Sequence, residues 1–200
     1  MDTAVIRAIN RLWLPVYPGL ARQGAEHCPQ KPLRILEVGC FSGGTGLEFL
    51  RLFAQSRLTV ALEIPELAES FFDDWRDGLT GLDASRITII STPLVPLAIA
   101  DGSYDLIFCR GVFFFLDGKG KLLAELSRVL ARGGNVFAGG GFGSHTPQSV
   151  IEPIADESRR LNYALGKQVV SPQEFHELLK TNRIKADIVE DGGLWAVMKK

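Results

Sequence analysis

The stretch from residue 35 to residue 46, ILEVGCFSGGTG, restricts the possible fold more than any other part of the chain. Ile35, Leu36 and Val38 form a short apolar run, typical of a parallel strand that is covered on both faces. The glycines that follow permit a tight turn, and apolar residues then return at helical spacing: Leu47, Phe49, Leu50, Leu52 and Phe53. A strand, a glycine turn and a helix in this order predict a nucleotide-type binding site in an α/β protein.

The rest of the chain repeats this alternation. Apolar strands are predicted at residues 34–38, 59–62, 87–90, 104–108 and 135–138, and helices at 45–54, 66–77 and 119–131. Further helices are expected at 147–165 and 172–181, and two last strands, 185–189 and 194–199, are joined by the turn-forming EDGG. The pattern predicts a Rossmann-like, seven-stranded, mostly parallel sheet with helices on both faces and an antiparallel C-terminal hairpin.

The first 32 residues form an N-terminal helical cap in this interpretation. Apolar residues recur at helical spacing over residues 3–14, and Pro15 and Pro18 then interrupt the pattern. A second helix is expected over residues 20–28. Residues 33–200 make up the core, and the length of 200 residues suits a single domain overall.

The composition limits which kinds of ligand and partner the chain is expected to bind. The net charge of -1 offers no excess positive charge for nucleic acid or anionic lipid, which favours a small-molecule substrate. No apolar run approaches the ~20 residues that a membrane-spanning helix needs. The three cysteines have no C-x-x-C spacing and no secretory signal precedes them, so we expect a reduced, cytoplasmic protein without a metal site.

Glu63 is the strongest candidate for a ligand contact. It ends the second predicted strand, where ligands of open α/β sheets bind, and its carboxylate could accept hydrogen bonds from both hydroxyls of a ribose. A nicotinamide cofactor would use the same acid, but the G-x-G-x-x-G fingerprint is absent because Phe41 replaces its second glycine. A solvated acid at the start of a helix remains the alternative for Glu63.

Four motifs in order resemble those of class I S-adenosylmethionine-dependent methyltransferases, over about residues 33–143. LEVGCFSGGTG is similar to their first motif, and ALEIPEL to their ribose-binding segment. ADGSYDLIFCRG looks like their fourth-strand segment, and LLAELSRVLARGGNVFAGGGFG like the following helix, turn and strand. The second glycine of the dinucleotide fingerprint lets the backbone approach a pyrophosphate. S-adenosylmethionine has no pyrophosphate, so a phenylalanine at position 41 is compatible with this cofactor.

The resemblance implies roles for particular residues. Backbone groups around Gly39 would hold the methionine part of S-adenosylmethionine, and Glu37 would help to orient its ammonium group. Ile64 would pack on the adenine, and Ser91 or Thr92 would replace the aspartate that many relatives offer to the adenine amino group. The full predicted cofactor set is Glu37, Gly39, Cys40, Phe41, Gly43, Glu63, Ile64, Ser91, Thr92, Cys109 and Arg110.

The methyl acceptor is expected near the end of the fourth strand. Tyr17, Phe114 and Phe142 are predicted to line its pocket. Arg110 could pair with the cofactor carboxylate, with an acidic substrate or in a structural salt bridge, while His145 is the candidate general base, with a surface histidine as the alternative.

The predicted function is methyl transfer from S-adenosylmethionine to a small molecule, with catalysis mainly by proximity. Two alternatives stay open at this point: a protein that binds the cofactor without transferring its methyl group, and a nicotinamide-dependent oxidoreductase. Few residues are left for a lid, so we expect either a small substrate or a second subunit, in a homodimer, that completes the pocket.

Overall fold

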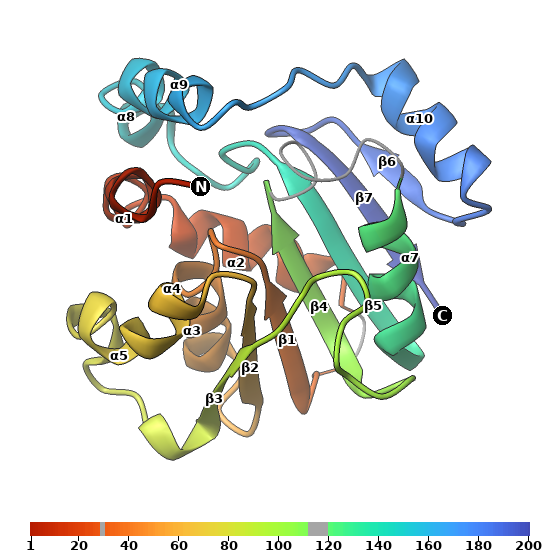
Figure 1. The fold of residues 1–200 in the computed structure, drawn as a ribbon, viewed down its shortest axis with the longest axis horizontal. Coiled ribbons are helices and arrows are strands. Elements are labelled where there is room, and N and C mark those ends of the chain that lie inside the picture. The colour runs from red at the N-terminus through yellow and green to blue at the C-terminus, as the bar shows by residue number, and fades with distance from the viewer. Residues whose placement is uncertain (29–30, 112–119) are drawn as a thin grey trace.

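The structure, a computed structural model, describes residues 1–28, 31–111 and 120–200. Within these ranges, seven strands form one sheet in the order β3-β2-β1-β4-β5-β7-β6 (Figure 1). The strands are β1 (Arg34–Val38), β2 (Arg57–Leu62), β3 (Ile87–Ser91), β4 (Tyr104–Arg110), β5 (Leu130–Gly140), β6 (Asp187–Val189) and β7 (Leu194–Lys199). β7 runs antiparallel to β5 and β6, and the other pairs are parallel. The predicted fold class is confirmed.

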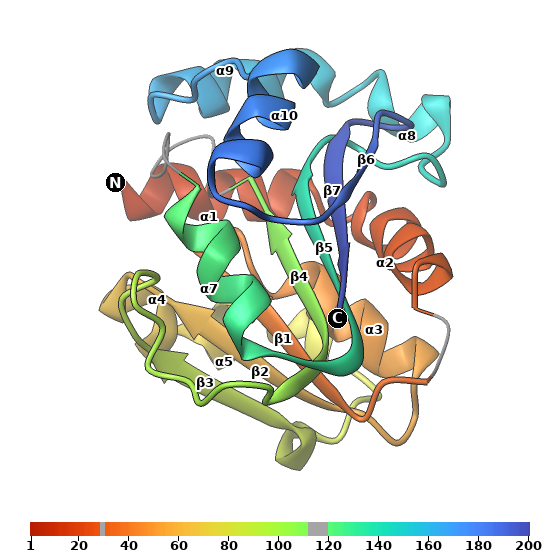
Figure 2. The same cartoon turned by 90° about the vertical axis from the view of Figure 1, so that its right-hand side faces the viewer.

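Helices cover both faces of the sheet because its central strands are apolar on both sides. On one face α3 (Gly44–Leu52) packs on β1 and β2, and α2 (Tyr17–Glu26) packs on α3. α7 (Lys121–Val129) packs against β5 on the other face (Figure 2). Phe108 of β4 and Phe137 of β5 are completely buried between these layers.

The carboxyl edge of the parallel strands lies under a second group of helices. α1 (Thr3–Leu12) and α9 (Ala155–Ala164) contact each other above this edge, and α8 (Gln148–Ile151) precedes α9 in the same layer (Figure 1). The Trp13 indole Nε1, just after α1, donates a hydrogen bond of 2.8 Å to Ser158 Oγ in α9. Strand order reverses between β1 and β4 beneath these helices, and such a reversal is where open α/β sheets bind ligands.

The cap and the sheet share one hydrophobic core. Ile6 and Ile9 of α1 and Leu20 of α2 are fully buried in the same cluster as the residues of the central strands. No helix in the described ranges is long and apolar enough to cross a membrane.

Three predicted helices differ from the structure. The helix predicted over 66–77 is divided into α4 (Pro65–Glu69) and α5 (Phe71–Asp74) at Ser70, whose hydroxyl donates to Glu66 O, 2.8 Å away. The helix predicted over 147–165 is divided at Pro153, between α8 and α9. α10 (Pro172–Thr181) matches its prediction and begins with a capping box between Ser171 and Glu174.

The third difference concerns the end of α7 (Lys121–Val129). The helix was predicted to continue to residue 131, with a strand from residue 135, but α7 ends at Val129 and β5 begins at once with Leu130. Tyr104 pairs with Leu130, the register then shifts, and Leu106 pairs with Asn135. Gly133 has a φ of 74° within this irregular part of β5.

Candidate active site

The glycine turn after β1 is built around the buried carboxylate of Glu37. Glu37 Oε2 accepts hydrogen bonds from the backbone amides of Gly43, at 2.7 Å, and Gly46, at 3.0 Å. Gly39 and Gly43 adopt φ values of 100° and 124°, a region that favours glycine. Glu37 therefore has a structural role, since its side chain fixes the shape of the turn. Its contact with the ammonium group of a ligand stays a prediction.

The charge state of Glu37 depends on its surroundings. Burial raises the pKa of this carboxyl to about 7, and the amides of Gly43 and Gly46 and the positive charge of Arg110 oppose the increase. Glu37 Oε1 is buried and has no hydrogen-bond partner among the described residues. One carboxylate oxygen thus remains to interact with a donor.

Aromatic side chains pack directly on the glycines of the turn. A Cβ atom at Gly44 would lie 2.1 Å from Cδ2 of Tyr17, and one at Gly43 would lie 2.3 Å from Cε2 of Trp75. Real side chains cannot approach so closely. These glycines are required by packing against the protein's own aromatic rings, whereas the sequence alone suggested a close approach of a ligand.

Glu63 and Ile64 follow β2 at the carboxyl edge. Both carboxylate oxygens of Glu63 are buried and form no hydrogen bond of ordinary geometry within the described ranges, although the Cys40 thiol lies close enough to oppose the rise in the pKa of this carboxyl. Burial raises the pKa of Glu63, while burial and the negative charge of Glu63 raise the pKa of the Cys40 thiol. The structure therefore brings Cys40 and Glu63 together. Ile64 is half-buried and caps α4.

The remaining predicted cofactor residues lie at the ends of β3 and β4. Ser91 is exposed, whereas the Thr92 hydroxyl accepts from Ala98 N and donates to Pro93 O, so it is engaged within its own loop. Cys109 is completely buried in β4, where it pairs with Ala138 of β5, and burial raises the pKa of its thiol.

Arg110 ends β4 inside a cage of aromatic rings. Its guanidinium carbon lies 4.3 Å from the ring centroid of Trp13, 5.2 Å from that of Phe41 and 5.5 Å from that of Tyr17. Arg110 Nη2 donates to Phe41 O at 3.1 Å and is also bonded to Asn10 and Tyr17. No carboxylate of the described residues lies within ion-pair distance of Arg110.

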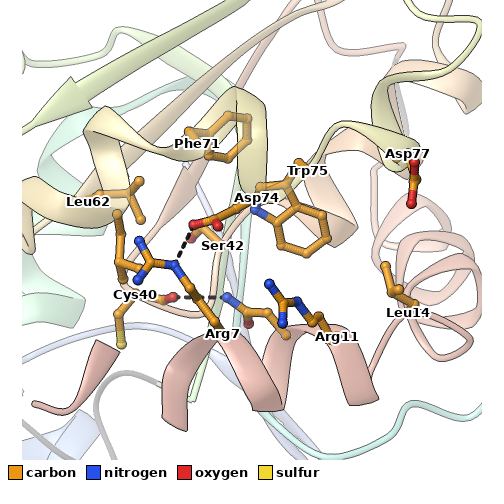
Figure 3. Close-up of a pocket in the computed structure, with 13 residues that line it drawn as sticks. Arg7, Arg11, Leu14, Cys40, Ser42, Leu62, Phe71, Asp74, Trp75 and Asp77 are labelled. Carbon is orange, nitrogen blue, oxygen red and sulfur yellow. Dashed lines mark hydrogen bonds and ion pairs between the residues drawn. The ribbon is translucent and has the colours of Figure 1, made fainter. Parts of the chain in front are cut away.

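Two pockets open beside this cage. The α1 pocket, of about 250 Å³, lies between α1, α4, α5 and the ends of β1 and β2 (Figure 3). Asn10 Nδ2 donates to Cys40 O, and Arg7 Nε forms a 2.8 Å ion pair with Asp74 across it. Its lining residues are Arg7, Asn10, Arg11, Leu14, Cys40, Ser42, Leu62, Leu67, Phe71, Asp74, Trp75, Asp77 and Gly78.

The α9 pocket, of about 350 Å³, lies between α9, the segment 167–170 and the ends of β4 and β5. Phe142 lines it and stacks on Trp13 with 4.8 Å between ring centroids. Its lining residues are Trp13, Phe41, Arg110, Gly111, Gly140, Gly141, Phe142, Ala155, Ser158, Arg159, Asn162, Tyr163, Lys167, Gln168, Val169, Val170 and Leu194.

Among the described residues, two that were predicted for the acceptor side of the site lie apart from these pockets. Tyr17 is buried in the wall between the cap and the glycine turn and lines neither pocket. His145 lies on the loop after β5, where its Nε2 is 2.9 Å from Oε1 of the exposed Glu26. Phe114 lies outside the described residues. In the part of the chain that is described, no group of three or more His, Cys, Asp or Glu side chains could hold a metal ion.

Several residues of the site carry no signal in the sequence. The sequence pattern places Asn10 and Trp13 only in an amphipathic helix, yet both side chains contact Arg110 in the structure. Lys167 lies in a segment without periodicity and nevertheless lines the α9 pocket. Only the tertiary arrangement brings these residues to the ends of β4 and β5.

Comparison with known families agrees with this arrangement. Residues 36–138, just over half of the chain, match the family described as methyltransferase domain. The chain belongs to this family. The matched segment of the methyltransferase runs from β1 to β5 and includes the glycine turn, Glu63 and Arg110. The resemblance to class I S-adenosylmethionine-dependent methyltransferases is confirmed, and the matched family favours methyl transfer over the oxidoreductase alternative.

Solved structures share the fold of this methyltransferase. One from Methanococcus maripaludis, assigned to the S-adenosylmethionine-dependent methyltransferases, has a TM-score of 0.75 at 21% identity, with 100% of this chain and 93% of that chain covered. A methyltransferase from Aquifex aeolicus has a TM-score of 0.64 at 18% identity, with 99% of each chain covered. Geranyl diphosphate C-methyltransferase from Streptomyces coelicolor has a TM-score of 0.63 at 16% identity, covering 90% and 75%.

A curated relative resembles part of the chain. The highly reducing polyketide synthase lcsB of Purpureocillium lilacinum is 26% identical over 140 residues. The match covers 67% of this chain and 5% of the synthase, so this chain corresponds to only a small part of that protein.

Proposed function

We propose that this methyltransferase transfers the methyl group of S-adenosylmethionine to a small molecule bound in the α9 pocket. The proposal depends above all on Glu63, whose two buried carboxylate oxygens have no hydrogen bond of ordinary geometry to any described residue and lie beside the Cys40 thiol. Leaving such groups unpaired costs about 1–3 kcal/mol each. The two hydroxyls of a ribose would satisfy both oxygens, which is the fit expected for an adenosine cofactor.

Other predicted cofactor residues surround Glu63 at the carboxyl edge of the sheet. Backbone groups of Gly39, Cys40, Phe41 and Gly43 would hold the methionine part, and Glu37 Oε1 would accept from its ammonium group. Ile64 would pack on the adenine. Because the Thr92 hydroxyl is already hydrogen-bonded within its loop, Ser91 is the better hydrogen-bond acceptor for the adenine amino group.

The protein's own contribution to the reaction is positional. S-adenosylmethionine supplies an electrophilic methyl group on a sulfonium, and its displacement needs a nucleophile held in line about 3–3.5 Å away. Phe41 and Phe142 shape the side of the α9 pocket that adjoins the glycine turn, and α9 covers that pocket. These residues would exclude water and fix the orientation of the acceptor. Cys109, buried in β4 next to Arg110, stays a predicted cofactor residue.

The size and lining of the α9 pocket favour a small acceptor. Its volume of about 350 Å³ is within the range of small-molecule sites. The Streptomyces coelicolor neighbour is described in complex with geranyl diphosphate, a small molecule. α9 and the segment 167–170 supply a cover from the same chain, so the proposal does not require a second subunit, although a homodimer stays a prediction.

The absence of a nucleic-acid partner and a cytoplasmic location also stay predictions. The low net charge of -1 supports the first. The second is supported by the cysteines, since Cys28, Cys40 and Cys109, all in described parts of the chain, form no disulfide.

Titration calorimetry with S-adenosylmethionine and S-adenosylhomocysteine tests the cofactor site. We expect Glu63→Ala to weaken both ligands by about 1–3 kcal/mol, which corresponds to a roughly 5- to 150-fold higher Kd. Glu69→Ala is the matched control, since Glu69 is an exposed acid on the neighbouring α4. Equal binding by the wild type and Glu63→Ala would contradict the assignment of Glu63.

A methyl-transfer assay separates catalysis from binding alone. Tritiated S-adenosylmethionine and a panel of small-molecule acceptors should give labelled product. Tight cofactor binding without transfer to any small molecule in the panel would favour the binding-protein alternative for this chain.

A further inference from the structure

The loop between β3 and β4 is fixed to α7 through Arg128 (Figure 2). Arg128 Nη1 donates to Ile99 O at 2.8 Å, and Nη2 donates to Leu97 O at 3.0 Å. Nε and Nη2 also donate to the carboxylate of Glu125, one turn earlier in α7, and Nη1 donates to Asp101 of the loop. A guanidinium has five N–H donors, and Arg128 uses all of them in these five contacts.

Glu125 holds the main chain of the same loop. Its Oε2 accepts a hydrogen bond of 2.8 Å from Leu97 N, so Arg128 and Glu125 together, termed the α7 clamp, bind both the amide and the carbonyl of that residue. Hydrogen bonds from Arg128 lower the pKa of Glu125, which keeps its carboxyl ionised at neutral pH. Leu97 itself is buried in the hydrophobic core. Charge-assisted hydrogen bonds on one side and apolar packing on the other therefore fix the loop.

The turn after β3 extends this constraint to the carboxyl edge of the sheet. Thr92 Oγ1 accepts a hydrogen bond of 3.2 Å from the amide of Ala98, the residue next to Leu97. Thr92 N donates to Leu62 O at 3.0 Å, and Leu62 pairs with Ser91 of β3. A continuous series of contacts thus leads from the α7 clamp to Ser91, the residue proposed to accept a hydrogen bond from the adenine amino group.

Recognition of the adenine through Ser91 requires an accurately placed main chain. The sequence reads STP over residues 91–93, without an acid. A serine hydroxyl lies closer to its own backbone than the carboxylate of an aspartate does, and a hydrogen bond needs a donor–acceptor distance of about 2.7–3.2 Å. A displacement of the end of β3 by about 1 Å would therefore break this contact. The α7 clamp opposes such a displacement.

We propose that Arg128 and Glu125 are positioning residues of the adenine subsite. By fixing the loop after β3, the α7 clamp holds the Ser91 hydroxyl where it meets the adenine amino group, and it thereby sets the preference of this methyltransferase for adenine over other purine bases. The inference rests on the proposed function, because it needs the adenine of the cofactor beside Ser91. Neither residue of the clamp touches the cofactor, since both act through the main chain of the loop.

Two ligands that differ only at the base test this preference. They are S-adenosylhomocysteine and S-inosylhomocysteine, in which an oxo group replaces the adenine amino group. We expect the wild type to bind S-adenosylhomocysteine at least tenfold more tightly in titration calorimetry. Equal affinities would overturn the inference, because the amino group would then not be recognised. No binding of either ligand would instead contradict the proposed function.

Arg128→Met should reduce this preference to less than threefold. The loss should come from weaker binding of S-adenosylhomocysteine, with the Kd of S-inosylhomocysteine changed by less than threefold. Arg51→Met is the matched control, since Arg51 also pairs with a glutamate three residues earlier, Glu48, and also donates to main-chain carbonyls of a loop, at Gly78 and Thr80. That loop contains no predicted cofactor residue, so the control should keep the tenfold preference.

Thermal unfolding separates positioning from stability alone. A purely structural role would lower the Tm of both arginine variants and leave the preference for S-adenosylhomocysteine unchanged. A tenfold preference in folded Arg128→Met, or an equal loss of preference in Arg51→Met, would overturn the inference. Should Arg128→Met fail to fold, Arg128→Lys decides, because lysine keeps the charge but lacks the planar fork that reaches several carbonyls. An unchanged preference in folded Arg128→Lys would also overturn the inference.

Discussion

Glu37 and Arg110 are opposite charges buried near the same turn, and each affects the other. Glu37 is 1% exposed and Arg110 is 6% exposed, so neither can rely on water to stabilise its charge. The positive charge of Arg110 lowers the pKa of Glu37 but does not offset the effect of burial. The protonation state of a single carboxyl is therefore coupled to the stability of the glycine turn.

We expect the free energy of unfolding of the ligand-free protein to decrease as pH rises through about 7. The pKa of Glu37 is about 7 in the folded protein and has an ordinary value of 4.5, so the fold favours the protonated form. The stabilisation is complete below pH 4.5 and is lost as pH rises through the folded pKa, by on the order of 3 kcal/mol. Urea unfolding at several pH values measures it.

Glu37→Gln is the control for this pH dependence. Its amide oxygen can still accept from Gly43 and Gly46, but the side chain cannot ionise. The difference in free energy of unfolding between the two proteins should change with pH across this window. Parallel profiles would show that another group is responsible.

His145 provides a second test at the level of one residue. A true general base contributes about 10²- to 10⁴-fold to a rate. Because His145 lines neither pocket and faces Glu26, we expect His145→Gln to change kcat by less than threefold for an acceptor that the enzyme methylates. A hundredfold loss, with normal binding of S-adenosylhomocysteine, would restore the role of base.

Among the elements, the start of α3 depends on its contact with α2. Gly44 is the first residue of α3, where alanine would ordinarily favour the helix by up to about 1 kcal/mol. The ring of Tyr17 occupies the position of the missing side chain, and overpacking of this kind costs about 1–3 kcal/mol. The clash should therefore outweigh the helix propensity.

Gly44→Ala should accordingly lower the free energy of unfolding by about 1–3 kcal/mol in urea denaturation. Gly78→Ala is a milder comparison, since its Cβ would lie 3.1 Å from the end of the Leu47 side chain and 3.6 Å, an ordinary contact distance, from Cε3 of Trp75. Equal stability of Gly44→Ala and the wild type would show that α2 can move away from the turn.

Elements with a strong local signal were predicted well. The strand over 34–38 and the helix over 172–181 match β1 and α10, because one is a buried apolar run and the other begins with Ser171 and Pro172. The start of β5 was missed because Leu130 joins the sheet only by pairing with Tyr104, far away in the sequence. A local pattern cannot contain that information.

At the scale of the whole molecule, the N-terminal cap and the sheet share one hydrophobic core. The predicted boundary at residue 32 therefore separates segments by sequence but not by packing. We expect urea unfolding followed by tryptophan fluorescence and by far-UV circular dichroism to give coincident single transitions. An earlier transition of the α1 and α2 region would indicate an independently unfolding cap.

The site was predicted only in part for the same reason. The turn, Glu63 and Arg110 stand at strand ends that the alternating pattern identifies, whereas the surroundings of Arg110 come from three distant segments. Asn10, Phe41 and Lys167 meet it only after the sheet, the cap and the chain beyond α9 have assembled.

Arg110 also connects two binding events. Arg110 Nη2 donates hydrogen bonds to the carbonyl of Phe41 in the glycine turn, to Asn10 of α1 and to Tyr17 of α2. The same guanidinium lines the α9 pocket. If either ligand shifts this side chain, cofactor and acceptor must change each other's Kd by the same factor, because coupling between two sites is reciprocal. The strength of this coupling, and with it the preference for binding one ligand first, then depends on how strongly Asn10 and Tyr17 fix the position of Arg110.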